Sequence, residues 1–195
     1  MRTKPVPKQR VDIKIIDNFL SEDTFRNLSK FVMEFDDDKI CWRYAPNVEW
    51  EGSEKFITYP YKGRNRRLFY MIANMMNKKA NWIDHTLMDM PIFSQIFGKS
   101  SIPNTDDLKL LRVKMNLYPG TEKIYEHAYH IDYNYEHMSG IFSLNTCDGY
   151  TKSKDGTKVD SVANRMLIFN GLKEHCSTTT TNAAARFNIN INWLT

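Results

Sequence analysis

The chain has 195 residues, of which 42% are hydrophobic and 13% aromatic. These proportions exclude a disordered chain and suffice for one packed domain. The formal net charge of +4 permits a nucleic-acid or other acidic partner but does not require one, because a mixed-charge surface gives the same sum.

The cysteines and the apolar runs indicate the cellular compartment. The three cysteines are odd in number and form no CxxC pair, so neither a disulfide framework nor a structural zinc cluster is indicated. No apolar run approaches about 18 residues, and the N-terminal MRTKPVPKQR has no apolar core of the kind found in signal peptides. We therefore expect a soluble cytoplasmic protein with no membrane partner.

The N-terminal part of the chain predicts a strand followed by a helix. The alternating VDIKIIDNFL, residues 11–20, is typical of a strand, and SEDTFRNLSKFVMEF, residues 21–35, has apolar side chains at helical spacing. Ser21 is suited to the N-cap, and Glu22 and Asp23 follow in the first turn, where carboxylates interact favourably with the helix dipole.

Two further helices are expected in the first half of the chain. RRLFYMIANMMNKKANWI, residues 66–83, and MPIFSQIFG, residues 90–98, carry apolar side chains at helical spacing. The irregular stretch at residues 38–65 is long for a compact domain, and such loops often form lids or binding surfaces. We expect it to contact the substrate, with Trp50 as a candidate residue.

The second half of the chain alternates with a period of two, as strands do. In LLRVKMNLYPG, residues 110–120, and in RFNININW, residues 186–193, apolar side chains alternate with mainly polar ones. The apolar sets are Leu111, Val113, Met115 and Leu117, and Phe187, Ile189, Ile191 and Trp193. The intervening sets are Arg112, Lys114, Asn116 and Tyr118, and Arg186, Asn188, Asn190 and Asn192. Further strand candidates lie near residues 126–133, 139–146, 157–162, 165–169 and 174–179.

Helices followed by strands predict a mainly β fold with α, in which an antiparallel sheet or barrel has helices packed on one side. We expect a single domain over residues 1–195, with a supporting part at about 1–107 and a β core that carries the site at about 108–195. The polar rows either face bulk water or line a wet cavity inside a jelly roll whose apolar outside meets the helices. Asparagine has low strand propensity, so the run of asparagines in the last segment favours the cavity.

His130 and Asp132 are the first candidates for metal ligands. Because they are two residues apart, both side chains would leave the same face of a strand and could reach one ion. His175 can supply a third ligand, and two histidines with one carboxylate suit a non-haem Fe(II) site with three open positions. Eleven residues after His175 is Arg186, whose planar guanidinium is suited to a carboxylate such as the distal one of 2-oxoglutarate.

The neighbouring histidines and tyrosines offer weaker interpretations. A tri-histidine site on His127, His130 and His137 can be imagined, but His127 is an odd number of residues from His130 and would point to the opposite face of a strand. Tyr133 and Tyr135, in the loop expected after the motif, are weak candidates for substrate contact.

These segments together resemble the 2-oxoglutarate- and Fe(II)-dependent dioxygenases. The likeness is to the branch similar to prolyl 4-hydroxylases, and particularly to its short members encoded by bacteriophages. It rests on IIDNFLSEDTF, on LYPG ahead of HID, on FSLN after it, on NRMLIFNG before the second histidine, and on HCSTTTTNAAARFNININW at the end. It covers most of the chain.

The resemblance implies a double-stranded β-helix, or jelly roll, flanked by N-terminal helices. It implies His130, Asp132 and His175 as iron ligands and Arg186 as the residue that holds the C5 carboxylate of 2-oxoglutarate. Tyr118 matches a residue that often touches 2-oxoglutarate; the alternative is a strand-end aromatic that covers the following turn.

Two positions depart from the pattern of the family. Ser143 stands where several prolyl hydroxylases have a tyrosine that helps the arginine, and Asn188 stands where the superfamily has serine or threonine. We therefore expect Arg186 to have other helpers, namely Asn188 and Ser177. Asp132 is retained where related halogenases have a small residue, which favours hydroxylation over halogenation.

The activity implied by the resemblance is O2-driven hydroxylation with release of succinate and CO2. Fe(II) is the cofactor, 2-oxoglutarate the cosubstrate, and ascorbate a candidate reductant. A peptidyl prolyl residue is the first substrate candidate and a nucleic acid base the second. We expect the protein to act in the cytoplasm, which would be the host cytoplasm if it is encoded by a phage. The alternatives are a non-catalytic β-barrel binding module, which loss of a ligand would favour, and a cupin-type metal protein, whose ligand spacing fits less well.

Overall fold

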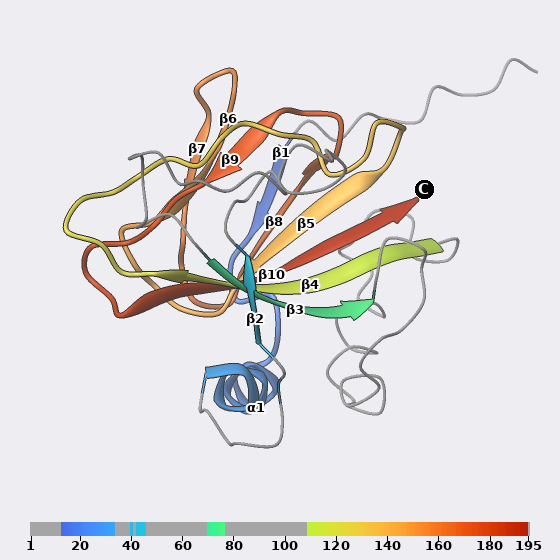
Figure 1. The fold of residues 1–195 in the computed structure, drawn as a ribbon. Coiled ribbons are helices and arrows are strands. Elements are labelled where there is room, and N and C mark those ends of the chain that lie inside the picture. Colours follow the sequence, from blue (N-terminus) through green and yellow to red (C-terminus); the bar gives the residue numbers. More distant parts are fainter. Residues whose placement is uncertain (1–12, 34–39, 41, 46–69, 77–108, 195) are drawn as a thin grey trace, which may run out of the picture.

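The structure, a computed structural model, describes residues 13–33, 40, 42–45, 70–76 and 109–194. Within these residues the strands form an antiparallel sheet of seven and another of three, with a helix against the larger sheet (Figure 1). This arrangement confirms the predicted mainly β jelly roll. In chain order the elements are β1 (Ile13–Ile16), α1 (Glu22–Met33), β2 (Arg43–Ala45), β3 (Tyr70–Met76), β4 (Lys109–Pro119), β5 (Met138–Ser143), β6 (Tyr150–Ser153), β7 (Lys158–Asp160), β8 (Arg165–Asn170), β9 (His175–Ser177) and β10 (Ala185–Leu194).

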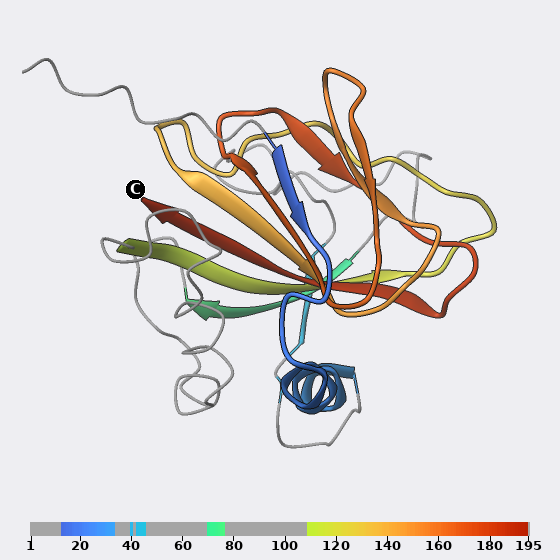
Figure 2. The ribbon, with the colours of Figure 1, turned by 180° about the vertical axis from the view of Figure 1, so that it is seen from behind.

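The large sheet has the strand order β1-β8-β5-β10-β4-β3-β2, and the small sheet has the order β7-β6-β9. Strands β4 and β10 pair with each other over nearly their whole length. The chain between β4 and β5 runs beside β9, to which it is joined by isolated bridges at Glu126–Thr178 and His130–His175. Figures 1 and 2 show the small sheet and this connection on one face of the large sheet and α1 on the other.

Helix α1 begins as predicted. The backbone N–H of Thr24 donates to Ser21 Oγ at 3.4 Å, so Ser21 is the N-cap. Leu28 and Val32 are buried in the main core with residues of the large sheet such as Phe142. The outer face of the large sheet is therefore covered by the apolar stripe of α1. No helix in the part of the chain that the structure describes is long and apolar enough to cross a membrane.

A buried asparagine joins the segment between β1 and α1 to the turn before β8. Asn164 accepts from Leu20 N–H at its Oδ1 and donates to Leu20 O from its Nδ2, both at 2.9 Å, and its own carbonyl accepts from Phe19 N–H at 3.0 Å. Asn164 has a φ of 61°, in the left-handed region that asparagine tolerates better than most residues. These bonds fix the start of α1 over the sheet.

The helix predicted for residues 66–83 is wrong where it can be checked. Tyr70–Met76 is the strand β3, which pairs with β4 from Met71 opposite Leu117 onward. A short apolar run does not distinguish a helix from a strand by periodicity alone. Here the edge of β4 supplies the backbone partners that decide the outcome.

Other expectations differ in detail. Strand β6 lies between the strand candidates at 139–146 and 157–162, where no strand was predicted, and residues 126–133 form isolated bridges rather than a strand. Strands β6 and β7 form a hairpin with Gly156 at a φ of 94° in its turn. The helix predicted at residues 90–98 and most of the loop predicted at 38–65, Trp50 included, lie outside the described residues.

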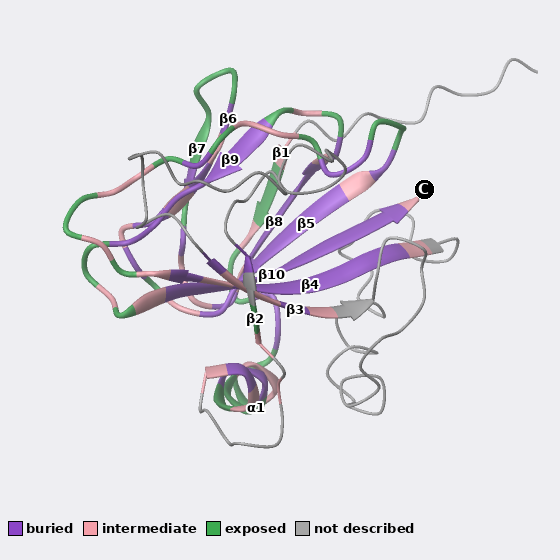
Figure 3. Cartoon of the chain, viewed as in Figure 1, coloured by how far each residue is buried: buried purple, intermediate pink, exposed green. Residues whose placement is uncertain are grey.

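The polar rows of β4 and β10 face the interior between the two sheets and not bulk water. Figure 3 shows both strands buried along most of their length. Each polar-row member on these strands is 7% exposed or less. The members are Arg112, Lys114, Asn116 and Tyr118 on β4, and Arg186, Asn188, Asn190 and Asn192 on β10.

Candidate metal centre

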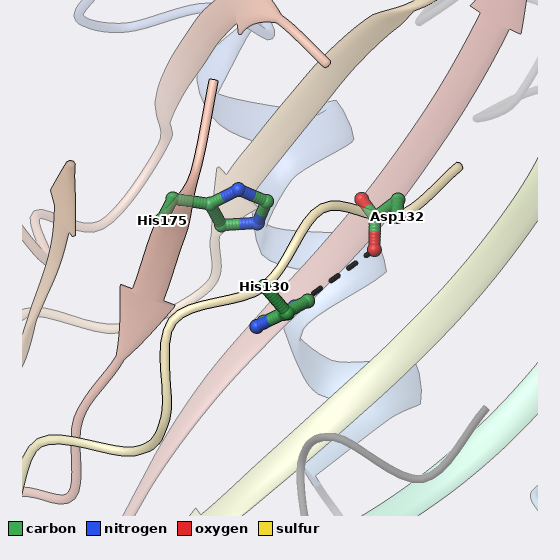
Figure 4. Close-up of side chains that lie close together, drawn as sticks. All are labelled: His130, Asp132 and His175. Atoms are coloured by element: carbon green, nitrogen blue, oxygen red, sulfur yellow. Dashed lines mark ion pairs between the residues drawn. The ribbon is translucent and has the colours of Figure 1, made fainter. Parts of the chain in front are cut away.

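The structure brings together the three residues predicted as metal ligands. One ligand atom from each of His130, Asp132 and His175 can be chosen so that all lie within 4.8 Å of one another. Figure 4 shows His130 and Asp132 on the connection after β4 and His175 on β9, with the three side chains turned toward a common point. Asp132 and His175 are buried, and the His130 side chain is 21% exposed.

Backbone pairing sets the distance between the two histidines. His130 N–H donates to His175 O at 2.9 Å, and His175 N–H donates to His130 O at 3.0 Å. This reciprocal pair places the imidazole rings with their centroids 4.7 Å apart. The two ligands therefore come from a single bridge between the connection and β9, although 45 residues separate them in the sequence.

Second hydrogen bonds orient both imidazoles. His130 Nδ1 lies 3.3 Å from Ala128 O, and His175 Nδ1 lies 3.1 Å from Lys173 O. A carbonyl oxygen can only accept, so Nδ1 carries the proton in each ring and Nε2 is left with its lone pair. His130 Nε2 lies 4.0 Å from Asp132 Oδ1, on the side where an ion would sit.

The protonation states suit a metal site at neutral pH. Burial lowers the pKa of His130 to about 4, and the neighbouring His175 adds to this effect, so His130 is neutral and can donate a lone pair. Burial alone would raise the pKa of Asp132. The Arg112 guanidinium and other nearby positive groups outweigh burial and hold that pKa well below its usual range.

Arg186 lies on the same interior face and is fully buried. Its guanidinium donates from Nη1 to Tyr150 O at 2.8 Å and from Nη2 to Thr151 Oγ1 at 2.9 Å. Its Nε has no hydrogen-bond partner among the described residues. A buried donor without a partner is costly, and a carboxylate would satisfy it. A Cβ at Gly149 would lie 2.8 Å from Arg186 Cδ, so glycine is needed there for this side chain to pass.

The helpers expected for Arg186 contact other residues instead. Ser177 Oγ lies 2.9 Å from His127 Nδ1, and Asn188 Oδ1 accepts from Asn116 Nδ2 at 2.8 Å. Thr151, which accepts from Arg186 Nη2 at 2.9 Å, was not predicted as a partner because β6 was not predicted. A part for Ser177 and Asn188 in cosubstrate binding stays a prediction.

Tyr118 lies beside Arg186 in the interior. The Arg186 Cζ atom is 5.7 Å from the centroid of the Tyr118 ring, and the hydroxyl is hydrogen-bonded to Ser177 and Asn188. Burial raises the pKa of Tyr118, partly offset by these hydrogen bonds, so the phenol keeps its proton. This position favours the interior interpretation of Tyr118 over a role in covering the turn.

The other histidines of the segment lie outside the triad. His127 is buried, with Nδ1 2.9 Å from Ser177 O and the ring centroid 5.2 Å from that of Tyr118. His137 Nδ1 lies 2.8 Å from Tyr135 O. The strand argument for His127 does not apply, because residues 126–133 form no strand.

The two tyrosines predicted to contact the substrate differ in exposure. Tyr133 is 9% exposed and Tyr135 is 43% exposed. Their rings pack with centroids 5.1 Å apart, and both lie in the connection that follows Asp132, as predicted. Their contact with a substrate stays a prediction.

The comparisons with known proteins agree with this geometry at the level of structure. No protein-family model matches the sequence, and no curated protein matches it either. A prolyl hydroxylase from Trichoplax adhaerens, solved with a peptide fragment of hypoxia inducible factor, has a TM-score of 0.58 at 16% identity, covering 93% of this chain and 83% of that one. A viral collagen prolyl hydroxylase from Paramecium Bursaria Chlorella virus-1, solved with 2-oxoglutarate, has a TM-score of 0.58 at 12% identity, covering 94% and 96%.

A third neighbour, a 2OG-Fe(II) oxygenase family protein from Burkholderia pseudomallei, has a TM-score of 0.56 at 11% identity, covering 94% of this chain and 85% of that one. The fold is that of the 2-oxoglutarate- and Fe(II)-dependent oxygenases. In this oxygenase fold the three candidate ligands and Arg186 share the interior between the sheets. The likeness to phage-encoded members stays a prediction.

Proposed function

We propose that the protein is a 2-oxoglutarate- and Fe(II)-dependent oxygenase that hydroxylates a C–H bond of its substrate. A peptidyl prolyl residue is the first candidate. The observation that carries this proposal is the convergence of His130, Asp132 and His175 within 4.8 Å, in the interior that also holds the buried Arg186.

The donor atoms fit Fe(II). Two imidazoles with free Nε2 lone pairs and one carboxylate form the facial set that non-haem Fe(II) oxygenases use, and this set leaves three positions for cosubstrate and dioxygen. When bound, the iron couples the oxidative decarboxylation of 2-oxoglutarate to insertion of oxygen into a C–H bond, with succinate and CO2 as products.

The residues around Arg186 fit a dicarboxylate. Two guanidinium nitrogens are held by Tyr150 O and Thr151 Oγ1, so the plane of the group is fixed before a ligand arrives. The Nε donor remains available, and the protonated Tyr118 hydroxyl lies nearby. These groups would bind the distal carboxylate of 2-oxoglutarate and orient its other end toward the triad.

The surroundings of the triad restrict access of water. The Phe169 ring packs edge-on against His175 with centroids 4.8 Å apart, and Asp132 is 5% exposed. The partly exposed His130 marks the open side of the site. A substrate C–H bond would approach there, beside the connection that holds Tyr133 and Tyr135.

The experiment that tests the proposal is an anaerobic titration of the Fe(II)-loaded protein with 2-oxoglutarate, followed by the visible charge-transfer band of a chelated 2-oxo acid. We expect a saturable band in the wild type and an affinity about 100-fold weaker in Arg186→Ala, since charge-assisted hydrogen bonds contribute about 1.5–3 kcal/mol each. Arg165→Ala is the control, because that strand arginine pairs with Asp17 outside the site.

The outcomes separate three classes of protein. A band that Arg186→Ala weakens supports the oxygenase, and metal binding without a band would indicate other metal chemistry. Absence of metal binding would favour a non-catalytic barrel. Succinate release with peptides or with nucleic acids then identifies the substrate class, and nucleic-acid binding is recognised by its steep loss with salt.

A further inference from the structure

The Asp132 carboxylate is held by donors from three adjacent strands. Arg112 Nη2, on β4, donates to Oδ1 at 2.7 Å. Asn190 and Asn192, on β10, donate from their Nδ2 atoms to Oδ2 at 3.1 and 2.8 Å. Ser139 Oγ, on β5, donates to Oδ2 at 3.4 Å. The carboxylate is therefore positioned by the large sheet, although Asp132 itself lies in a connection.

The donors also hold one another. Asn192 Oδ1 accepts from Arg112 Nε at 3.1 Å, and Asn192 Nδ2 donates to Ser139 Oγ at 2.9 Å. These contacts follow from the strand register, in which Asn192 lies opposite Arg112 on one side and Ser139 on the other. Guanidinium can only donate and carboxylate can only accept, so the orientation of the Asn192 amide is fixed.

The two oxygens of Asp132 are in different surroundings. Oδ2 receives the three bonds from Asn190, Asn192 and Ser139. Oδ1 receives one bond, from Arg112 at 2.7 Å, and is the oxygen 4.0 Å from His130 Nε2 on the side of the triad. A carboxylate oxygen has about two lone-pair directions, so a metal that took both oxygens would have to displace donors from Oδ2.

We infer that Asn190 and Asn192, with Arg112 bracing Asn192, are positioning residues that make Asp132 a ligand through Oδ1 alone. This inference rests on the proposed function, because it concerns the metal of that site. An octahedral ion with two histidines and a single carboxylate oxygen keeps three open positions. A carboxylate bound through both oxygens would occupy one of them, so the asparagines preserve the position that dioxygen needs.

The test counts the waters on a bound metal, without cosubstrate and without turnover. Mn(II) replaces Fe(II), and the relaxation of water protons is measured per bound ion. The variants are Asn192→Ala and Asn190→Ala, which remove donors from Oδ2. The matched control is Asn188→Ala, on the same strand and the same face, whose side chain bonds to Asn116 rather than to Asp132.

We expect relaxivity to fall by about one third in Asn192→Ala, because this variant removes the shortest bond to Oδ2 and also the contact that holds Ser139 Oγ, so that Oδ2 can join the metal and displace one of three waters. Asn190→Ala should show a smaller fall, since it removes the longer bond and leaves the Arg112–Asn192 contact in place. Asn188→Ala should keep the wild-type value. If Asn192→Ala does not fold, Asn190→Ala alone still decides the outcome.

Two results would overturn the inference and can be told apart. Wild-type relaxivity in Asn190→Ala and Asn192→Ala, with metal bound stoichiometrically, would overturn the positioning role and leave the proposed oxygenase standing. A wild-type protein that binds no Mn(II) or Fe(II) would overturn both proposals.

Discussion

The two faces of β10 are equally buried and chemically opposite. Toward α1 the strand presents Ile189 and Trp193, which are 0% and 2% exposed. Toward the small sheet it presents Asn188 and Asn192, which are 2% and 0% exposed. The exposed fraction therefore does not distinguish the two faces. They differ in polarity: the side chains toward α1 pack in the apolar core, and those toward the small sheet are amides that form hydrogen bonds.

The difference separates the residues that stabilise the fold from those that we propose bind a ligand. Apolar burial on the outer face stabilises the sheet by about 25 cal/mol per Å² removed from water. On the inner face, hydrogen bonds only offset the desolvation of polar groups, and several atoms, such as Arg186 Nε and Asn190 Oδ1, have no partner among the described residues. The inner face therefore adds less to stability than the apolar outer face, and its polar groups are of the kind that can bind a polar ligand.

The largest expected effect is on the inner face. His175→Ala should abolish metal binding while the protein stays folded, because one of three ligands is lost and the outer core is untouched. Metal content per folded protein measures the result, with circular dichroism as the check on folding. His137→Ala is the control, a buried histidine near the triad that should keep a full equivalent of metal. Stoichiometric Fe(II) in His175→Ala would remove that residue from the ligand set.

The second prediction compares neighbours on opposite faces. Ile189→Ala should lower the free energy of unfolding by about 2–5 kcal/mol, because it leaves a cavity in the core. Asn188→Ala should lower it by only about 1–2 kcal/mol, the net value of its hydrogen bonds to Asn116 and Tyr118. Urea unfolding of the metal-free proteins gives both numbers. Equal losses at the two positions would show that the faces do not divide in this way.

The third prediction concerns the dependence of stability on pH. Burial is the main cause that lowers the pKa of His127 to about 4, from an ordinary value of 6.5. Between these values the unfolded chain binds a proton that the folded protein does not, so this contribution is complete above about pH 6.5 and is lost as the pH falls toward 4.

The expected loss is up to about 3 kcal/mol for this group. Unfolding at pH 7 and pH 5 measures it, and His127→Gln should reduce the dependence on pH without removing it, since His130 titrates in the same range. An unchanged slope in that variant would show that His127 is not the group responsible.

The parts of the fold that the sequence predicts correctly are those with their own periodicity. Strands β4 and β10 alternate strictly, and His130, Asp132, His175 and Arg186 carry chemistry that restricts their placement. Alternation is therefore sufficient to locate the interior face, and residue chemistry to group the three candidate ligands. The expectation that His130 and Asp132 share the face of a strand was wrong, because residues 126–133 form no strand.

The parts that were missed depend on partners far away in the chain. Strand β3 exists because β4 offers it an edge, and β6 has buried Thr151 and Ser153 but no apolar alternation. Because β6 was not recognised, the hydrogen-bond partners of Arg186 were assigned to nearer residues. The Asp132 contacts were missed because its donors lie on strands far from it in the sequence. The run of asparagines suggested a wet interior but did not indicate which carboxylate these side chains would bind.

The place of β10 in the large sheet has a consequence for biosynthesis. It is the fourth of seven strands in the sheet order and the last described strand to be made. Until it emerges from the ribosome, β5 and β4 expose the backbone edges that it will later join, and neither the β10 donors to Asp132 nor Arg186 is present. This sheet therefore cannot be completed until β10 has been made, and until then the chain exposes unpaired strand edges of the kind that favour aggregation.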